Sequence, residues 1–464
     1  MSLISSISGI RGTIGGKVGE NLTPIDIVKY VSAFLTLLKE NEPNKTLRIV
    51  VGRDARISGE MVSSIVCGTI QSMGADVIDL GLSTTPTVEM SVVSHEADGG
   101  IIITASHNPM QWNALKLLRS NGEFVSGADG TRIQQWVKEA DFTYAEAKKL
   151  GHYSSYENAI ADHIEKILAL EWVDVDAISR ANFNVAVDAV NSTGGMAIAQ
   201  LLKKLGVKRC TILNGEPTGV FAHNPEPLPE HLTEISSLID KNSFHVGFVV
   251  DPDVDRLAIV MENGEMFGEE YSLVAIADYI LQNQKGNTVS NLSSTRALRD
   301  ISEKYGVSYA AAAVGEVNVV EKMKETNAII GGEGNGGIIL PALHYGRDAL
   351  VGIALFLTYM AKTKKSPVQI KSQFPTYFIS KNKIELKPET NVPHILDCVA
   401  EKYKAYSVNR IDGVKVDFED NWIHLRASNT EPIIRIYAEA ANMSIAENLA
   451  KKILNDIKEI INEQ

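Results

Sequence analysis

Short apolar runs rich in β-branched residues alternate with helix-like segments through most of this chain. Thr23, with a proline next to it, has the pattern of a helix start, and the helix is expected to reach about Lys39. Leu47 to Val51 reads as a strand, a second helix-like stretch follows Ser58, and Gly100 to Ile103 has the pattern of a buried strand. Alternation of this kind produces parallel sheets with right-handed crossovers. The first third therefore predicts an α/β domain with a parallel sheet.

The alternation restarts twice further along the chain. Phe183 to Val187 and Val246 to Val250 are strand-like runs, and a helix is expected over residues 271–282. A length of 464 residues fits three or four domains. The expected fold class is thus α/β, with three related α/β domains and a smaller C-terminal α+β domain. The expected ranges are 1–150, 151–250, 251–375 and 376–464.

The last part of the chain has a different pattern. A helix is expected near Pro393 to Lys404, followed by strands that begin at Gly413, Ile423 and Ile433. A capping box, Ser444 to Glu447, predicts the start of the closing helix. The buried face of that helix is expected to carry Ile445, Leu449, Ile453 and Ile457. Strands grouped between two helices predict a small α+β domain.

Composition excludes several classes of partner. The formal charge of −12 argues against nucleic acid, because phosphate backbones bind net basic faces, although a local cationic cluster can still bind a small anion. No apolar run approaches the roughly 18 residues of a membrane span, and the N-terminus lacks the pattern of a signal peptide. The three cysteines are widely separated, which predicts free thiols in a reducing compartment. We therefore expect a cytoplasmic protein with no membrane or nucleic-acid partner.

The segment TASHNP, residues 104–109, directly follows the strand that ends at Ile103. Ligands of open α/β sheets bind beyond the carboxyl ends of the strands, so Ser106 is a candidate nucleophile. Lys116, ten residues on, supplies a nearby amine. An ordinary turn is the alternative, because serine, asparagine and proline are turn residues. The segment is not a GxSxG elbow, so it does not favour an α/β-hydrolase.

A second polar segment, DPDVDR, also follows a strand. Asp251, Asp253 and Asp255 repel one another unless a cation neutralises them, and a hard divalent ion with oxygen ligands does so. This predicts a magnesium site, and Arg256 beside it suits a site that also holds a phosphoryl group. An EF-hand and a solvated acidic turn are the alternatives. The EF-hand is disfavoured because Arg256 occupies its glycine position and the flanks resemble strands.

A glycine-rich segment, residues 331–337, contains a formal GxGxxG pattern. A dinucleotide site would need a helix next, but the residues that follow cannot open one properly. A loop that brings Glu333 and Asn335 close to a polyol is the better interpretation, and a plain glycine-rich turn is the alternative.

The segment RASNTEP, residues 426–432, combines a guanidinium, two hydroxyls and an amide, with Arg435 beyond it. Such a set can cradle an oxyanion, and a solvated loop is the alternative. Two more basic, glycine-containing turns surround Arg11 and Arg53 to Arg56. Taken alone, turns of that kind are more often structural.

Taken together and in this order, the four polar segments resemble the α-D-phosphohexomutases, a family that includes phosphoglucomutase, phosphomannomutase/phosphoglucomutase and phosphoglucosamine mutase. The resemblance spans essentially the whole chain and implies a heart-shaped protein of four domains around a central cleft. It implies that Ser106 carries a phosphoryl group, that Lys116 is the general base, and that magnesium binds between Ser106 and the three aspartates. The other implied residues are the active-site contacts His107, Arg11 and Arg256, the sugar-hydroxyl loop with Glu333 and Asn335, and the phosphate clamp with Arg426, Ser428, Asn429, Thr430 and Arg435.

The resemblance also implies a reaction, in which a hexose 6-phosphate and a hexose 1-phosphate interconvert through a sugar 1,6-bisphosphate that also serves as activator. A monomer or homodimer is expected. Two departures concern the sugar: Asn335 replaces a serine that is common in the family, and Val314 to Val317 lacks a basic residue sometimes found there. We expect a phosphoglucosamine mutase, with a mixed phosphoglucomutase/phosphomannomutase as the second candidate. A metal-dependent sugar-phosphate phosphatase and a silent sugar-phosphate-binding protein are more distant alternatives.

Overall fold

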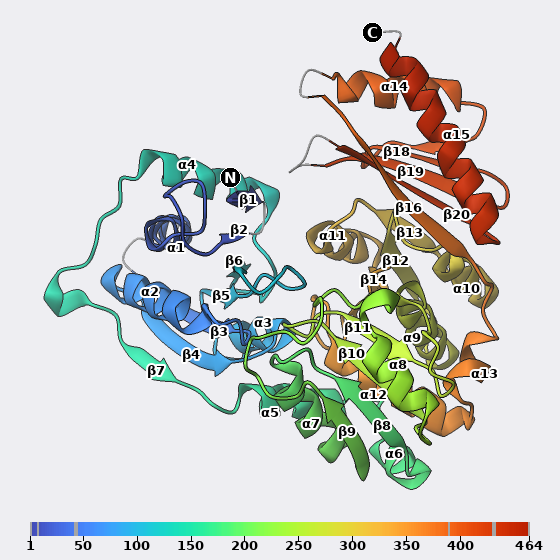
Figure 1. The fold of residues 1–464 in the computed structure, drawn as a ribbon. Helices are drawn as coiled ribbons and strands as arrows, with labels where there is room; N and C mark the ends of the chain where they lie inside the picture. The colour runs from blue at the N-terminus through green and yellow to red at the C-terminus, as the bar shows by residue number, and fades with distance from the viewer. Residues whose placement is uncertain (1, 7–8, 41–44, 388–389, 429–432, 463–464) are drawn as a thin grey trace. The chain divides into compact units, whose positions relative to one another are not determined.

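The computed structural model describes residues 2–6, 9–40, 45–387, 390–428 and 433–462 (Figure 1). The chain forms two compact units, one from residues 1–279 and 336–371 and the other from residues 280–335 and 372–464. Each unit contains a hydrophobic core of its own. Among the described helices, none combines the length and the apolar character needed to cross a lipid bilayer.

The first unit begins with a seven-stranded mixed sheet. Strand β3 pairs in parallel with β4 and β5, as expected, but β6 runs antiparallel to β5 and to β2. The parallel pairing predicted for the strands β3, β4 and β5 is therefore confirmed, and β6 adds an antiparallel neighbour because the short segment between β5 and β6 turns the chain straight back beside β5. The strands, in sheet order, are β1 (Ile4–Ser6), β2 (Gly9–Thr13), β6 (Trp112–Arg119), β5 (Gly99–Ile103), β3 (Arg48–Arg53), β4 (Asp76–Leu82) and β7 (Tyr153–Ser155).

Helices cover both faces of this sheet. On one face, α1 (Pro24–Lys39), α2 (Gly59–Ser72) and α4 (Gly127–Glu139) pack on the sheet in one buried core. On the other, α3 (Thr85–Ser94) and α5 (Ala159–Leu168) enclose a smaller core. The predicted start of α1 is confirmed, since the side chains of Thr23 and Asp26 form a capping box.

The second sheet of this unit has the order β11-β10-β8-β9, and only its edge strand β11 is antiparallel to its neighbour. Its strands are β8 (Asn184–Asp188), β9 (Arg209–Leu213), β10 (Val246–Val250) and β11 (Leu257–Val260). The domain boundary proposed between residues 250 and 251 thus falls between two paired strands. The surrounding elements are α6 (Val175–Ala181), α7 (Gly194–Lys204), α8 (Thr233–Asp240), α9 (Glu269–Asn283), β15 (Gly337–Ile339), α12 (Ala349–Thr363) and α13 (Pro367–Lys371).

Helix α12 is buried over most of its length. Every residue from Ala349 to Met360 is buried, so the helix is apolar on all sides rather than amphipathic. Asp348 caps its first turn through the N–H groups of Leu350 and Val351. The position of Asp348 is therefore fixed by the start of a buried helix.

The second unit contains two sheets. In the first, β12 (Asn287–Asn291) lies between β13 (Tyr309–Ala312) and β14 (Ala328–Glu333), all parallel, with helices α10 (Ala297–Tyr305) and α11 (Glu316–Thr326). The other is an antiparallel sheet of the order β16-β20-β19-β18-β17. Its strands are β16 (Phe378–Glu385), β17 (Ser407–Asn409), β18 (Val414–Asp417), β19 (Trp422–Ala427) and β20 (Ile433–Ala440). Helices α14 (Val392–Lys402) and α15 (Met443–Asn462) cover one face of that sheet (Figure 1).

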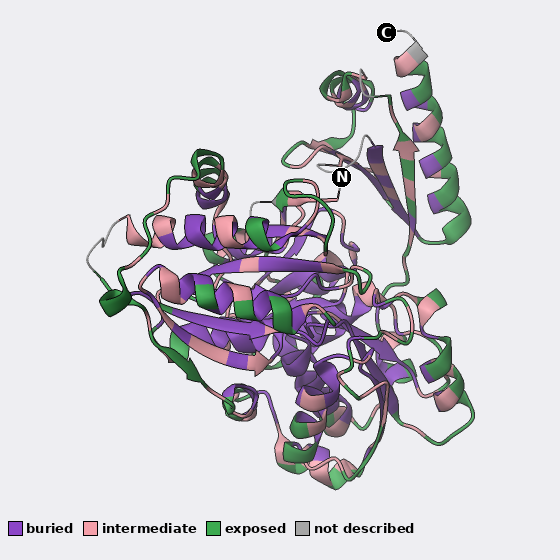
Figure 2. Cartoon of the chain, turned by 60° about the vertical axis from the view of Figure 1, so that its left-hand side comes forward, coloured by how far each residue is buried: buried purple, intermediate pink, exposed green. Residues whose placement is uncertain are grey.

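The start and the buried face of α15 differ from the prediction. The side chain of Asn442, rather than Ser444, accepts the N–H of Ile445 at 2.9 Å and begins the helix. Ile453 and Ile457 are buried as expected and Leu449 packs half-buried against the same core, but Ile445 is exposed, and Ala446 and Ala450 complete the buried face. Exposed residues line the other side of this helix (Figure 2). The sequence pattern selected only the larger side chains, and two alanines are buried together with them.

Candidate active site

Ser106 lies in the loop after β5, in the first unit. Its backbone has a φ of +48°, a left-handed conformation that is uncommon for residues other than glycine and that often marks a functional site. Its N–H donates to Thr104 Oγ1 at 2.9 Å, and its hydroxyl donates to Asp251 Oδ2 at 2.7 Å. The loop therefore presents the serine hydroxyl directly to the acidic segment after β10.

The Arg56 side chain stabilises the conformation of this loop through hydrogen bonds. Its side chain is buried and paired with Asp54, with 3.1 Å between Nε and Oδ2. Its two terminal nitrogens donate to the carbonyls of Pro109 at 2.7 Å, Trp112 at 2.9 Å and Asn108 at 2.7 Å, and to that of Ser106. One guanidinium thus donates to four carbonyl groups of the serine loop and of the first residue of β6.

Asp251, Asp253 and Asp255 follow β10 and are fully buried. They lie between two strands of one sheet, so the EF-hand alternative does not apply. Val254, between them, has a φ of +62°, which is strained for a β-branched residue. Thr85 stabilises the segment, because its hydroxyl donates to Asp253 Oδ2 at 2.6 Å and its N–H donates to the Asp253 carbonyl at 2.9 Å.

Two cations lie against the three aspartates. Lys116, on β6, places Nζ 2.6 Å from Asp253 Oδ2 and 3.3 Å from Asp255 Oδ2. Arg347 donates from Nη2 to Asp255 Oδ2 at 2.7 Å. Burial by itself would lower the pKa of Lys116, but the charges of Asp253 and Asp255 raise it above the usual lysine value. Burial and the two neighbouring carboxylates raise the pKa of Asp251.

The carboxylate oxygens of this group fit a divalent cation. One ligand oxygen from each aspartate lies within 4.8 Å of the others. Asp253 Oδ1 and Asp255 Oδ1 are buried and form no hydrogen bond with any described residue. Buried carboxylate oxygens without hydrogen bonds are costly, and a hard cation with oxygen ligands would satisfy them. The three aspartates are therefore a group that can hold a metal ion.

Three more residues predicted for the site, His107, Arg11 and Arg256, belong to this part of the first unit. His107 Nδ1 lies 3.4 Å from the Ser106 hydroxyl. Burial and the positive charge of Arg256 lower the pKa of His107 to about 2, so its imidazole is neutral at physiological pH. Burial and Arg256 also lower the pKa of Arg11, on β2. Arg256 Nε is buried without a hydrogen bond to a described residue and lies 3.9 Å from Asp255 Oδ1.

The second unit contains the residues predicted to bind the sugar. Glu333 ends β14 and is buried, and its Oε1 accepts from Asn291 Nδ2 at 2.9 Å and from the Gly315 N–H at 3.1 Å. Asn335 is partly exposed in the next turn. The segment around Gly315, where the sequence lacks a basic residue, thus contacts Glu333 directly.

Three cationic residues share one row of the antiparallel sheet in this unit. Arg426 on β19 pairs with Arg435 on β20, and Arg435 pairs with Lys383 on β16. Like charges opposite one another destabilise a sheet, so the row fits an anionic ligand. Arg435 Nε is buried without a hydrogen bond to a described residue, while Arg426 Nη1 lies 3.5 Å from Asp412. Ser428 donates its N–H to Ile433, and the predicted residues Asn429 and Thr430 lie outside the described residues.

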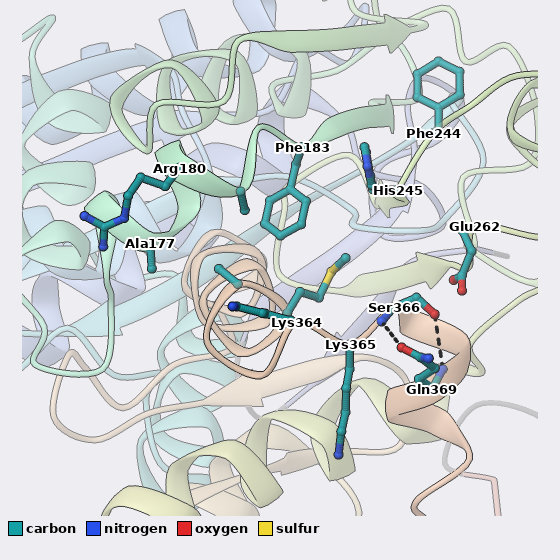
Figure 3. A pocket seen from close by; sticks show the side chains of 13 residues that line it. Ala177, Arg180, Phe183, Phe244, His245, Glu262, Lys364, Lys365, Ser366 and Gln369 are labelled. Carbon is teal, nitrogen blue, oxygen red and sulfur yellow. Dashed lines mark hydrogen bonds between the residues drawn. The ribbon is translucent and has the colours of Figure 1, made fainter.

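A large pocket lies elsewhere in the first unit. Its cavity of about 850 Å³ has Phe183 and His245 in its wall, next to Lys364 (Figure 3). Phe183 and His245 come immediately before β8 and β10, whereas Asp251 comes immediately after β10. The pocket is thus at the opposite end of the strands from the three aspartates and is not part of the candidate active site.

The sequence missed three residues of this site. Thr85, Arg56 and Arg347 are 168, 50 and 92 positions from the residues they support. For Arg56 a weak signal existed, since it lies in a basic turn beside a glycine. Nothing in the local pattern of Thr85 or Arg347 pointed to the aspartates. The roles assigned to the predicted site residues stay predictions.

Comparison with known proteins agrees with this arrangement. The alpha/beta/alpha domains I, II and III of phosphoglucomutase/phosphomannomutase match residues 4–144, 161–264 and 269–377, and the C-terminal domain matches residues 387–456. A phosphoglucomutase/phosphomannomutase from Thermococcus kodakarensis is 35 % identical over 435 residues, which is 92 % of this chain and 94 % of the relative. A phosphoglucosamine/phosphogalactosamine mutase from Sulfurisphaera tokodaii is 31 % identical over 468 residues, 99 % of each protein.

A solved structure has the same fold. The crystal structure of a phosphoglucomutase/phosphomannomutase family protein from Burkholderia thailandensis matches with a TM-score of 0.85 at 24 % identity, over 98 % of each chain. Four family domains in order, together with relatives above 30 % identity over nearly the whole length, establish that this chain belongs to the phosphoglucomutase/phosphomannomutase family and is an enzyme of the phosphohexomutase class.

Proposed function

We propose that this enzyme interconverts hexose 6-phosphate and hexose 1-phosphate through a phosphorylated Ser106 and a sugar 1,6-bisphosphate, with magnesium at the three aspartates. The observation that carries the proposal is the contact between the Ser106 hydroxyl and Asp251, 2.7 Å apart, beside a group of carboxylates that fits a cation. Free cysteines among the described residues agree with a cytoplasmic enzyme, which we propose to act as a monomer or homodimer.

In the proposed reaction, the residues of the first unit have separate chemical roles. The bond between Ser106 Oγ and phosphorus breaks while a sugar hydroxyl oxygen forms a bond to the same phosphorus. Magnesium would neutralise charge on the transferred group. Lys116 would take the proton of the attacking hydroxyl. In its present ion pairs Lys116 is a cation, so it can act as a base only once the charges of Asp253 and Asp255 are neutralised.

The dependence of activity on the metal tests the role proposed for the three aspartates. Asp253→Asn is expected to lower kcat about 100-fold or more, because several kcal/mol of charge stabilisation in the transition state would be lost. EDTA should abolish the activity of the wild type, and added Mg²⁺ should restore it. Asp240→Asn, an exposed carboxylate on α8, is the matched control and should leave kcat unchanged. Full activity in EDTA would remove the metal from the proposal.

The cationic row of the second unit is proposed to bind the phosphate that does not react. Arg426→Ala should raise KM roughly 10- to 150-fold, since a charge-assisted hydrogen bond worth about 1.5–3 kcal/mol would be lost. Steady-state kinetics with each hexose phosphate measures the effect. Arg410→Ala is the control, because Arg410 is exposed and pairs with Asp397 on the same domain. If both variants retain the wild-type KM, the phosphate binds elsewhere.

Glucosamine phosphate is the substrate that we propose. The relative from Sulfurisphaera tokodaii carries a phosphoglucosamine name, and a carboxylate such as Glu333 favours an ammonium group at the sugar 2-position. Glucose and mannose phosphates are the second candidates, because the relative from Thermococcus kodakarensis carries that name and a carboxylate also accepts from neutral hydroxyls.

The identity of the sugar can be decided by kcat/KM for the three 1-phosphates under one set of conditions. We expect glucosamine 1-phosphate to be turned over best. A value more than tenfold below that for glucose or mannose 1-phosphate, about 1.4 kcal/mol in transition-state binding, would favour the second candidates. Measuring free phosphate in the same assays separates a mutase from a phosphatase, since a mutase releases almost none.

A further inference from the structure

A second cluster of potential metal ligands lies in the first unit, apart from the three aspartates. His163 is on α5, and His344 and Asp348 belong to the segment that leads into α12. His163 Nε2 lies 2.9 Å and His344 Nε2 lies 3.3 Å from the same oxygen, Asp348 Oδ2. His163 and Asp348 are almost completely buried, at 1 % and 0 % exposure. Two imidazoles and one carboxylate thus converge on one point.

The far side of each of these groups contacts another polar group. His163 Nδ1 lies 2.9 Å from the Thr87 hydroxyl, and His344 Nδ1 lies 3.2 Å from Glu89 Oε2. Asp348 Oδ1 accepts the N–H groups of Leu350 and Val351, so that Oδ2 is directed at the imidazoles. Protein metal sites have this arrangement, in which outer partners fix the orientation of each histidine and carboxylate ligand.

The charge of the cluster also favours a divalent cation. Glu89 and Asp348 bring two negative charges into the interior, where uncompensated charge is costly. One proton on His344 would leave a net charge of −1, whereas a divalent ion would make the cluster neutral with both imidazoles in their ligating form. The two carboxylates therefore stabilise positive charge at this point.

We propose that His163, His344 and Asp348 form a second metal site, for zinc or a similar divalent transition metal. Two nitrogen donors and one oxygen donor suit zinc, while the all-oxygen aspartate group suits magnesium. Bonds of about 2.0–2.2 Å at tetrahedral angles separate neighbouring ligand atoms by roughly 3.3 Å, close to the 2.9 and 3.3 Å found between carboxylate and imidazoles.

The proposed metal would have a structural role. It would join α5 to the segment before α12, and α3 would be tied to it through Thr87 and Glu89. The close approach of that segment to α3 requires Gly346, because a Cβ there would lie 1.8 Å from Glu89 Oε2. Arg347 directly precedes Asp348 in this segment. Its guanidinium donates a hydrogen bond to the Asp255 carboxylate. The site would thus stabilise the position of Arg347 without touching the substrate.

Cobalt titration of the tag-free, metal-stripped enzyme tests the proposal. Excess Mg²⁺ is present throughout, so that the aspartate group is occupied. We expect one equivalent of Co²⁺ per chain with the visible absorption of a nitrogen- and oxygen-ligated ion, displacement by Zn²⁺, and a rise in the thermal midpoint. Zinc analysis of enzyme purified without chelators should find the same stoichiometry. No saturable Co²⁺ binding in excess Mg²⁺ would overturn the proposal and leave a proton as the cation of the cluster.

Variants distinguish this site from other places where cobalt could bind. His344→Ala should abolish stoichiometric binding, and Thr87→Val, which only removes the hydroxyl next to His163, should weaken it about 10- to 100-fold. His245→Ala, an exposed histidine of the same unit, and Asp253→Asn should leave the cobalt spectrum unchanged. A spectrum that survives His344→Ala and Thr87→Val but is lost with Asp253→Asn would place cobalt at the aspartates and contradict the proposal. If His344→Ala does not fold, Thr87→Val and the wild-type titration decide.

Discussion

Replacing Ser106 by alanine is expected to reduce mutase activity at least about 10³-fold while the fold is retained, because the enzyme would lose the atom that carries the phosphoryl group. The side chain is small, and its hydroxyl contacts only Asp251 and His107 among the described residues, so its removal leaves no large cavity. Coupled assays in both directions measure the loss, and thermal unfolding checks the fold.

Ser64→Ala is the matched control for this variant. The Ser64 hydroxyl lies on the surface of α2 and donates to the carbonyl of Glu60, so its removal should change neither activity nor stability. A Ser106→Ala enzyme as active as this control would show that no phosphoserine takes part in the reaction.

Arg56→Leu is expected to be the most destabilising substitution near the site, by about 3–5 kcal/mol. It would leave the Asp54 carboxylate buried without its cation and remove the hydrogen bonds to four carbonyls of the serine loop and of the first residue of β6. In urea unfolding, the loss of stability should move the first unfolding transition to a lower urea concentration. The activity that remains should fall as well, because the serine loop depends on this side chain for its shape.

Two further variants make this result specific. Arg53→Leu removes an ion pair with the exposed Glu60 and one long hydrogen bond to the Asp54 carbonyl, and it should cost less than Arg56→Leu, about 1 kcal/mol. Asp54→Leu combined with Arg56→Leu should be less unstable than Arg56→Leu alone, because no buried charge is then left without a partner. Equal stability of Arg53→Leu and Arg56→Leu would contradict the role given to the buried pair.

Local patterns predicted much of the fold because their physical causes are local. The cap at Thr23 and the buried strand that ends at Ile103 depend on neighbouring residues, and both were found. The order of the polar segments also sufficed for the family. The strand β6 has no prediction of its own, and its antiparallel pairing with β5 depends on the short turn that joins the two strands. Of the predicted buried face of α15, only Ile445 at its first turn is exposed, because a periodic pattern does not show where along a helix the contact with the sheet begins.

The site residues that directly follow a strand could be predicted from the sequence. The residues that stabilise them from distant positions in the sequence could not. Ser106 and Asp251 each follow a strand of their own sheet, so their candidacy could be inferred. Thr85 and Arg347 reach the aspartates only through the packing of α3 and α12, which no short motif records. The charge state of Lys116 could not be predicted from the sequence either, because its partners Asp253 and Asp255 are more than a hundred residues away along the chain.

A phosphoryl chase tests the central claim most directly. Enzyme labelled by radioactive sugar 1,6-bisphosphate is digested, and the labelled peptide is sequenced by mass spectrometry; a second sample is mixed with unlabelled hexose monophosphate. We predict that the label resides on Ser106 and passes to the sugar as bisphosphate, with little free phosphate released. Label on another residue, or label released as inorganic phosphate before any bisphosphate forms, would contradict the account.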